Sequence, residues 1–189
     1  MKRIITPALM IMALILSGCA KNDVIEKNFE DERLKWSQSQ SLSFTADIVT
    51  ELDDTVFECT LLCSREGENI VLEVQTPENI AGIKAKLNDS SAQIEYDGII
   101  LAVENASIGE ISPISGAAKI MRALTKSPLT QIWTEKDQER ELIVTEVYIS
   151  ESEYARLWFL KENFSLIHAE LVSGGRSVVK CNITSFTKE

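Results

Sequence analysis

The sequence predicts a mainly β, α+β domain of about ten antiparallel strands, with one helix before them and another near 113–126. Three observations lead to this fold class. Apolar and polar residues alternate in most segments after residue 41, as they do in strands with one buried face. The connections between these segments are too short for the crossovers that parallel strands need. Two segments instead space their apolar residues three or four apart, which indicates helices.

The first helix is predicted shortly after residue 20. Asp23 and Glu26 have the spacing of a capping box, and Ile25, Phe29 and Trp36 recur on one side. We expect a helix of about three turns. Its apolar side should pack against the domain, because its polar side is not basic, as a membrane-surface helix would be.

Period-two alternation begins at Leu42 and defines six strands, which cover about residues 42–52, 56–64, 70–75, 83–87, 92–96 and 99–103. The clearest turn is Asp97-Gly98, since both residues tolerate the positive φ that a type I′ hairpin requires. The six strands should therefore form an antiparallel meander.

A helix interrupts the meander. Ser112 and Pro113 suit its N-cap and first position, an apolar stripe extends from Ile114 to Leu124, and Pro128 stops it. Four more strands are predicted at about 142–149, 155–161, 165–173 and 177–186. The charged stretch 133–141 is predicted as a loop, with a short strand at 131–134 as the alternative.

The inward side chains of ten strands would form a wide, curved apolar face that must be covered, and the helix at 113–126 is the expected lid. If this helix fills the concavity permanently, its apolar stripe is ordinary core. If it opens, the groove can hold an acyl chain, at about 0.8 kcal/mol for each buried methylene. The residues expected to line this space, all equally compatible with a core role, are Phe57, Leu61, Leu72, Ile83, Leu101, Met121 and Leu124.

Three cysteines follow residue 20. Cys59 and Cys63 share one strand face about 13 Å apart, which is too far for a direct disulfide. Cys181 can pair with Cys59 or with Cys63 if the last strand lies alongside theirs. The alternative is that all three are small buried apolar residues.

Catalytic patterns are scarce, so we expect no enzyme, no metal site and no bound cofactor. The sequence has no Gly-x-Ser-x-Gly elbow, phosphate loop or dinucleotide-binding glycine pattern. Its single histidine, His168, alternates with Ile167 and Ala169 in a predicted strand and has no partner at metal-ligand spacing. The net charge of −10 argues against a nucleic-acid partner, because phosphate binding needs clustered Lys and Arg.

The N-terminal segment has the pattern of a secretory signal. Lys2 and Arg3 precede an apolar run of 13 residues, Ile4 to Leu16, where a membrane-spanning helix needs about 20. The run ends in Leu16-Ser17-Gly18-Cys19, and with this lipobox the chain resembles a bacterial lipoprotein precursor. The resemblance implies that Cys19 carries a diacylglycerol thioether and further acyl groups such as palmitate, and that residues 1–18 are removed as a signal peptide.

This resemblance defines the expected organisation and location. Residues 19–40 would be the lipidated N-terminus and first helix, and residues 41–189 the β domain. The chain would be anchored through Cys19 to the extracytoplasmic face of the bacterial cell membrane. In a two-membrane cell, Ala20 would permit sorting to the outer membrane.

The element order resembles the superfamily of the lipoprotein carrier LolA, its receptor LolB, and the LppX and RseB domains. The break Gln75-Thr76-Pro77-Glu78-Asn79 and the closing runs His168-Ala169-Glu170-Leu171 and Asn182-Ile183-Thr184-Ser185-Phe186 support it. The resemblance implies an open half-barrel covered by helices that binds lipid or an acylated polypeptide. The closing runs are most similar to clostridial GerS-type germination lipoproteins, which implies a cell-wall amidase as partner.

Two departures from this family limit what is implied. The soluble carrier has no acylated Cys, so a chain with Cys19 is a different component. The acylated receptor uses an exposed apolar loop residue for transfer, and the polar loops of this sequence contain no clear counterpart.

Overall fold

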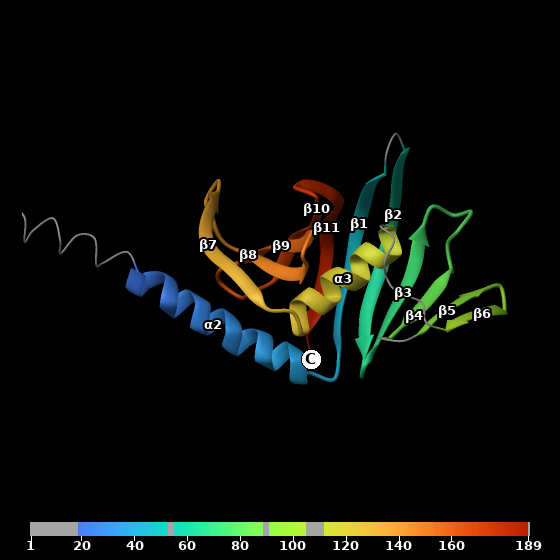
Figure 1. Ribbon diagram of the computed structural model, residues 1–189, viewed down its shortest axis with the longest axis horizontal. Helices are drawn as coiled ribbons and strands as arrows, with labels where there is room; N and C mark the ends of the chain where they lie inside the picture. Colours follow the sequence, from blue (N-terminus) through green and yellow to red (C-terminus); the bar gives the residue numbers. More distant parts are fainter. Residues whose placement is uncertain (1–18, 53–54, 89–90, 105–111, 189) are drawn as a thin grey trace, which may run out of the picture.

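All strands of the described chain lie in one antiparallel sheet, with two helices beside it (Figure 1). The computed structural model describes residues 19–52, 55–88, 91–104 and 112–188. The expected signal segment 1–18 lies outside the described residues. In chain order the elements are α2 (Cys19–Gln38), β1 (Leu42–Leu52), β2 (Thr55–Glu66), β3 (Asn69–Thr76), β4 (Lys84–Leu87), β5 (Ser91–Tyr96), β6 (Ile99–Glu104), α3 (Pro113–Thr125), β7 (Leu129–Asp137), β8 (Arg140–Ser150), β9 (Glu153–Leu160), β10 (Leu166–Ser173) and β11 (Arg176–Lys188).

The strand order is β6-β5-β4-β3-β2-β1-β11-β10-β9-β8-β7. Two local meanders, β1–β6 and β7–β11, are thus joined by the pairing of the first strand with the last, from Leu42 with Lys188 to Thr50 with Val179. The sheet curves into an open half-barrel, and α3 crosses the concave side (Figure 1). The prediction of a mainly β antiparallel fold with an N-terminal helix and a central helix is confirmed.

The number of strands is 11 rather than about ten, because residues 129–137 form β7. This strand pairs with β8 from Leu129 opposite Val147 to Asp137 opposite Arg140. The prediction of a loop over 133–141 was wrong. The second half of this edge strand, from Thr134 to Asp137, has only polar side chains, so an apolar period of two is absent there.

Helix α2 is longer than the expected three turns, since it extends over 20 residues from Cys19. Phe29 and Trp36 are fully buried, and their ring centroids lie 5.0 and 5.5 Å from that of Phe159 in β9. Trp36 also contacts Phe186 of β11 edge-on at 5.8 Å. The expected docking of the apolar side of this helix on the domain is confirmed.

Helix α3 begins as the sequence predicts, with Ser112 as N-cap and Pro113 after it. Ser112 Oγ accepts a hydrogen bond from the Ser115 backbone N–H, and Ser115 Oγ accepts one from the Ser112 backbone N–H. Most of the helix is buried, and a Cβ on Gly116 would lie 2.8 Å from Val179 Cγ2 of β11. The missing side chain of Gly116 therefore allows α3 to lie directly on the sheet.

Candidate functional site

The centre of the half-barrel is occupied by α3. Four of the expected lining residues, Leu61, Leu72, Met121 and Leu124, are fully buried and belong to one apolar cluster. Ile83 is partly buried and packs against this cluster. These five side chains form the packing between α3 and the sheet.

Arg33 of α2 holds the C-terminal end of α3. Its guanidinium is buried and donates hydrogen bonds to the carbonyl oxygens of Ala123 at 3.0 Å, Leu124 at 3.4 Å and Ser127 at 2.5 Å. Carbonyls at the end of a helix have no intrahelical partner, and the helix dipole there favours a cation. Glu30 accepts a further hydrogen bond from Arg33 at 2.9 Å, which balances its charge.

Lys119 fixes the middle of α3. Its ammonium donates to both carboxylate oxygens of Glu153 in β9, at 2.8 and 3.0 Å, and both side chains are largely buried. Opening α3 would separate this pair and the Arg33 contacts. The central part of the concave face is therefore filled in this structure.

Exposed apolar side chains occur on the concave side in β5 and β6 and near the start of β2, which β3 and β4 separate from β5. The Asp97-Gly98 turn, with φ of 50° and 77°, pairs Tyr96 with Ile99 and Ile94 with Leu101. Because paired residues point to the same face, all four belong to the concave side, as does the Phe57 side chain.

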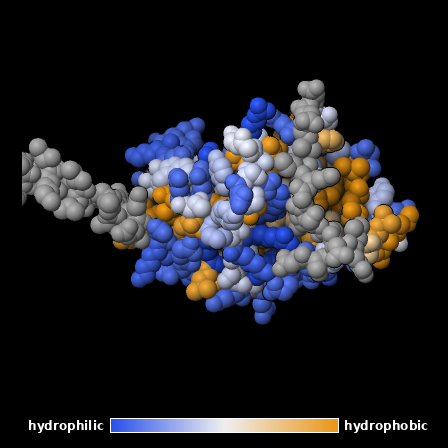
Figure 2. Space-filling model, viewed as in Figure 1, coloured by the Kyte–Doolittle hydropathy of each residue, from blue (hydrophilic) through white to orange (hydrophobic). Residues whose placement is uncertain are grey.

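These five side chains are 38–66% exposed although they point inward on the sheet. Figure 2 shows hydrophobic surface gathered at the end of the molecule that contains β5 and β6. We call the open face the residues Phe57, Ile94, Tyr96, Ile99 and Leu101.

Phe57 and Leu101 were expected to line the apolar space, whereas Ile94, Tyr96 and Ile99 were not. The missed residues share the alternation of their strands, and the Asp97-Gly98 hairpin fixes their register. From this register, the sequence alone would have placed all three residues on the same sheet face as Leu101. The choice between a covered and an open inward position depends on where α3 lies, which the strand pattern does not encode.

Of the two alternatives for the cysteines, the structure has free thiols at Cys59, Cys63 and Cys181 and no disulfide among them. A disulfide with Cys181 required β11 to lie beside β2, but β1 separates them, with Ile48 opposite both Cys59 and Cys181. Two strand spacings put these two backbones about 9.6 Å apart, beyond the reach of a disulfide. Burial raises the pKa of Cys59 to about 11 and raises those of the other two as well.

His168 lies on β10, facing away from α3. Its Nδ1 is 3.0 Å from Asn182 Oδ1, and its ring meets that of Trp158 edge-on at 4.9 Å. Within the described residues, no group of three or more His, Cys, Asp or Glu side chains is arranged to hold a metal ion. The other ring nitrogen of His168, Nε2, lies 3.4 Å from Glu170 Oε1.

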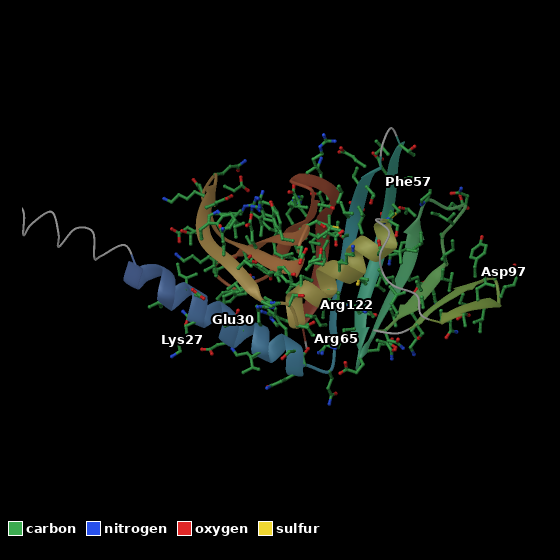
Figure 3. All side chains as sticks on the ribbon, in the orientation of Figure 1. Lys27, Glu30, Phe57, Arg65, Asp97 and Arg122 are labelled. Carbon is green, nitrogen blue, oxygen red and sulfur yellow. The ribbon has the colours of Figure 1, made fainter. Side chains whose placement is uncertain are left out.

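Cys19 is the first residue of α2, and its acylation stays a prediction. Figure 1 shows the start of α2 and the β5–β6 hairpin at opposite ends of the long axis. In Figure 3 Lys27 lies on the α2 side and Asp97 at the far end. Of the helices in the described ranges, none has the length and apolar content required to cross a bilayer. Because the β5–β6 hairpin and the start of α2 lie at opposite ends of the long axis, the open-face residues of this hairpin lie far from Cys19.

No family model and no curated protein sequence matches the chain. Solved structures do share its fold. A domain from Vibrio parahaemolyticus, described as an outer membrane lipoprotein-sorting protein, covers 87% of this chain and 93% of its own, with 8% identity and a TM-score of 0.52.

The chain shares the fold of this lipoprotein-sorting protein domain. A LolA superfamily protein from Nitrosomonas europaea aligns over 84% of this chain and 91% of its own, with 12% identity and a TM-score of 0.45. A chain from the complex of the Clostridioides difficile CwlD amidase with the GerS lipoprotein aligns over 87% and 92%, with 11% identity and a TM-score of 0.38. At these identities, likeness to solved structures concerns the fold alone.

Proposed function

We propose that this protein is a membrane-anchored, non-catalytic lipoprotein that binds the acyl chain of a lipid or acylated polypeptide on the open face. The observation that carries the proposal is the exposure of five inward-pointing apolar side chains, one in β2 and four in β5 and β6, on the concave side of a LolA-like half-barrel. Large exposed apolar patches of soluble domains commonly mark binding sites. The open face contains no charged side chain, which suits a hydrocarbon ligand.

The ligand would lie beside α3 rather than beneath it. Gly116, Arg33 and Lys119 hold this helix against the sheet, so the acyl chain would meet Phe57 and Leu101 instead of Met121. Each methylene buried there contributes about 0.8 kcal/mol. The Tyr96 hydroxyl, at the edge of this face, can bond a polar group at the end of the chain.

The anchor would be the acylated Cys19, which holds the domain at the extracytoplasmic face of the cell membrane. Two or more acyl chains anchor a protein stably, whereas a single one binds marginally. Because α2 begins at Cys19 and the open face lies at the opposite end of the molecule, the ligand site would face away from that bilayer.

Ligand binding is tested with two charge substitutions on one strand. Leu101 points to the concave side and Ile100 to the outer side, with similar exposure of 61% and 57%. The full chain is purified in detergent, and lipid released by solvent is quantified by mass spectrometry. We expect Leu101→Glu to lower the recovered lipid at least tenfold and Ile100→Glu to leave it unchanged. Equal recovery from both variants would contradict acyl binding on the open face.

Anchoring is tested with Cys19→Ser in cells fed a labelled fatty acid. We expect the variant to accumulate as an uncleaved precursor without label, whereas the parent chain is labelled and cleaved. A labelled Cys19→Ser chain would show that the lipobox interpretation is wrong.

The firm fixation of α3 favours a second candidate, an interaction protein whose groove is permanently filled. The GerS lipoprotein was solved in complex with the CwlD amidase, and a comparable role here would be to support a cell-wall (spore cortex) amidase during sporulation or germination. Titration of the full chain with a purified amidase of this type discriminates the two. Saturable binding that Leu101→Glu leaves unchanged, together with no recovered lipid, would favour this role.

A further inference from the structure

The two edges of the sheet differ in chemistry. Edge strands normally carry charges that prevent another strand from adding to them. The β7 edge follows this rule, with Glu135, Lys136 and Asp137 in its second half. The β6 edge begins with Ile99, Ile100 and Leu101, all of them more than half exposed. Edge β6 therefore lacks the usual protection.

The β6 backbone offers hydrogen-bonding groups along this edge. In a two-residue hairpin the residues that flank the turn form a hydrogen-bonded pair, and such pairs alternate along the strands. Tyr96 and Ile99 flank the Asp97-Gly98 turn, so Ile99 and Leu101 bond to β5. The backbone groups of Ile100 and Ala102 then point away from β5, and among the described strands β6 pairs only with β5.

The charges around this edge indicate what could pair with it. The hairpin sequence 91–104 contains Glu95, Asp97 and Glu104 and no Lys or Arg. Glu95 lies on the outer face with Ile100, whereas the concave face is apolar. A second copy would bring like charges to this edge on a chain whose net charge is −10, which disfavours self-pairing.

We propose that β6 accepts an extended segment of a partner protein as a twelfth strand, and that this segment alternates apolar and basic residues. Its apolar side chains would extend the open face, and its basic side chains would lie on the outer face near Glu95. Addition of a strand to a sheet edge is an established mode of peptide recognition. This interaction goes beyond acyl binding, because it uses the backbone of β6 and the outer face.

The test uses a fluorescein-labelled octapeptide of alternating Val and Lys, whose binding to the full chain in detergent is measured by anisotropy at about 0.15 M salt. The decisive variant is Ala102→Pro, since proline at this position removes only an N–H directed away from β5. It alters neither the net charge nor the open face. The matched control is Ala102→Val.

We expect saturable binding to the parent chain and to Ala102→Val, at least tenfold weaker binding to Ala102→Pro, and none of an alternating Val and Glu peptide. Equal affinity of Ala102→Pro would mean attraction by net charge alone and would overturn the proposal, as would absence of binding to the parent chain. If Ala102→Pro is misfolded by circular dichroism, amide exchange of the parent chain decides. The Ile100 and Ala102 amides must then be protected when the peptide binds.

Failure of this proposal is distinguishable from failure of acyl binding. Phe57 lies on β2, away from the β6 edge, so Phe57→Glu should lower lipid recovery and leave peptide binding unchanged. Ala102→Pro should weaken peptide binding and leave lipid recovery unchanged.

Discussion

The guanidinium of Arg33 in α2 donates through Nη2 to the carbonyl oxygen of Ala123 in the last turn of α3, at 3.0 Å. One buried side chain thus joins the two helices of the described chain. It also satisfies carbonyls at the end of α3 that would otherwise be buried without partners. The position of α3 in the half-barrel therefore depends on α2, the element that directly follows the predicted lipid anchor.

Removal of this contact should destabilise the domain. We expect Arg33→Met to lower the free energy of unfolding by about 2–3 kcal/mol, because hydrogen bonds to a charged group are lost and buried carbonyls stay unpaired. Urea denaturation measures the effect. Lys27→Met, on the exposed side of the same helix, is the control and should change stability by less than about 0.5 kcal/mol. Similar values for the two variants would show that Arg33 does not secure α3.

The buried pair Lys119–Glu153 should behave as a unit. Lys119→Met leaves the Glu153 carboxylate buried without its partner, so we expect a loss of about 3–5 kcal/mol. The double variant Lys119→Met/Glu153→Leu should recover most of it, since both charges are gone. A double-mutant cycle from urea denaturation measures the coupling. Additive losses would contradict a direct interaction of these two side chains.

Glu32 links α2 to the C-terminal strand and should make stability depend on pH. Partial burial acts to raise its pKa, but hydrogen bonds from Lys188 at 2.7 Å and Lys35 at 2.9 Å outweigh burial and hold the pKa below its ordinary value of 4.5. A carboxylate with a lowered pKa in the folded state stabilises the fold above its ordinary pKa. This contribution is lost as the pH falls through the lowered value.

We therefore expect Glu32→Gln to lower the free energy of unfolding at pH 7 by about 1 kcal/mol. The difference from the parent chain should shrink below pH 4.5 and vanish once the folded state also binds the proton. Urea denaturation at a series of pH values measures it. A difference that is constant across this range would mean that the charge of Glu32 is not responsible.

The half-buried Cys59 should be unreactive at neutral pH. Burial raises its pKa to about 11, so only about 10⁻⁴ of the thiol is ionised at pH 7, and the thiolate is the reactive form. We expect its alkylation by iodoacetamide, followed by peptide mass mapping, to accelerate about tenfold per pH unit up to about pH 10. Cys63 and Cys181 are fully buried and should react only after unfolding in urea. Rapid modification of Cys59 at pH 7 would show a lower pKa than its burial implies.

The strands and α3 could be predicted because their signals are local. Alternation defines each strand of the first meander, and Asp97-Gly98 alone determines which residues pair across its hairpin. Ser112 and Pro113 likewise mark the start of α3. The second half of edge strand β7 was predicted as a loop because the residues from Thr134 to Asp137 are all polar, so no period of two distinguishes them from a charged loop.

The open face could be predicted only in part, because its exposure results from contacts between distant segments. Phe57 and Leu61 lie on the same face of β2, and the sequence pattern does not distinguish them. One is exposed and the other fully buried, since α3 covers only part of the sheet. The same applies to Cys59 and Cys181, whose separation depends on the insertion of β1 between their strands. Neither the exposure of Phe57 nor the separation of the two cysteines is encoded in a local sequence pattern.

The junction between β1 and β11 has a consequence for the order in which the chain can fold. Each meander contains neighbours in sequence and can assemble as soon as its own residues are available. Leu42 can pair with Lys188 only after residue 188 has been synthesised, so the two halves of the sheet cannot pair with each other before then. Loss of residues 176–188 would therefore remove β11, end the direct pairing between the two halves of the sheet, and leave β1 and β10 as new edges.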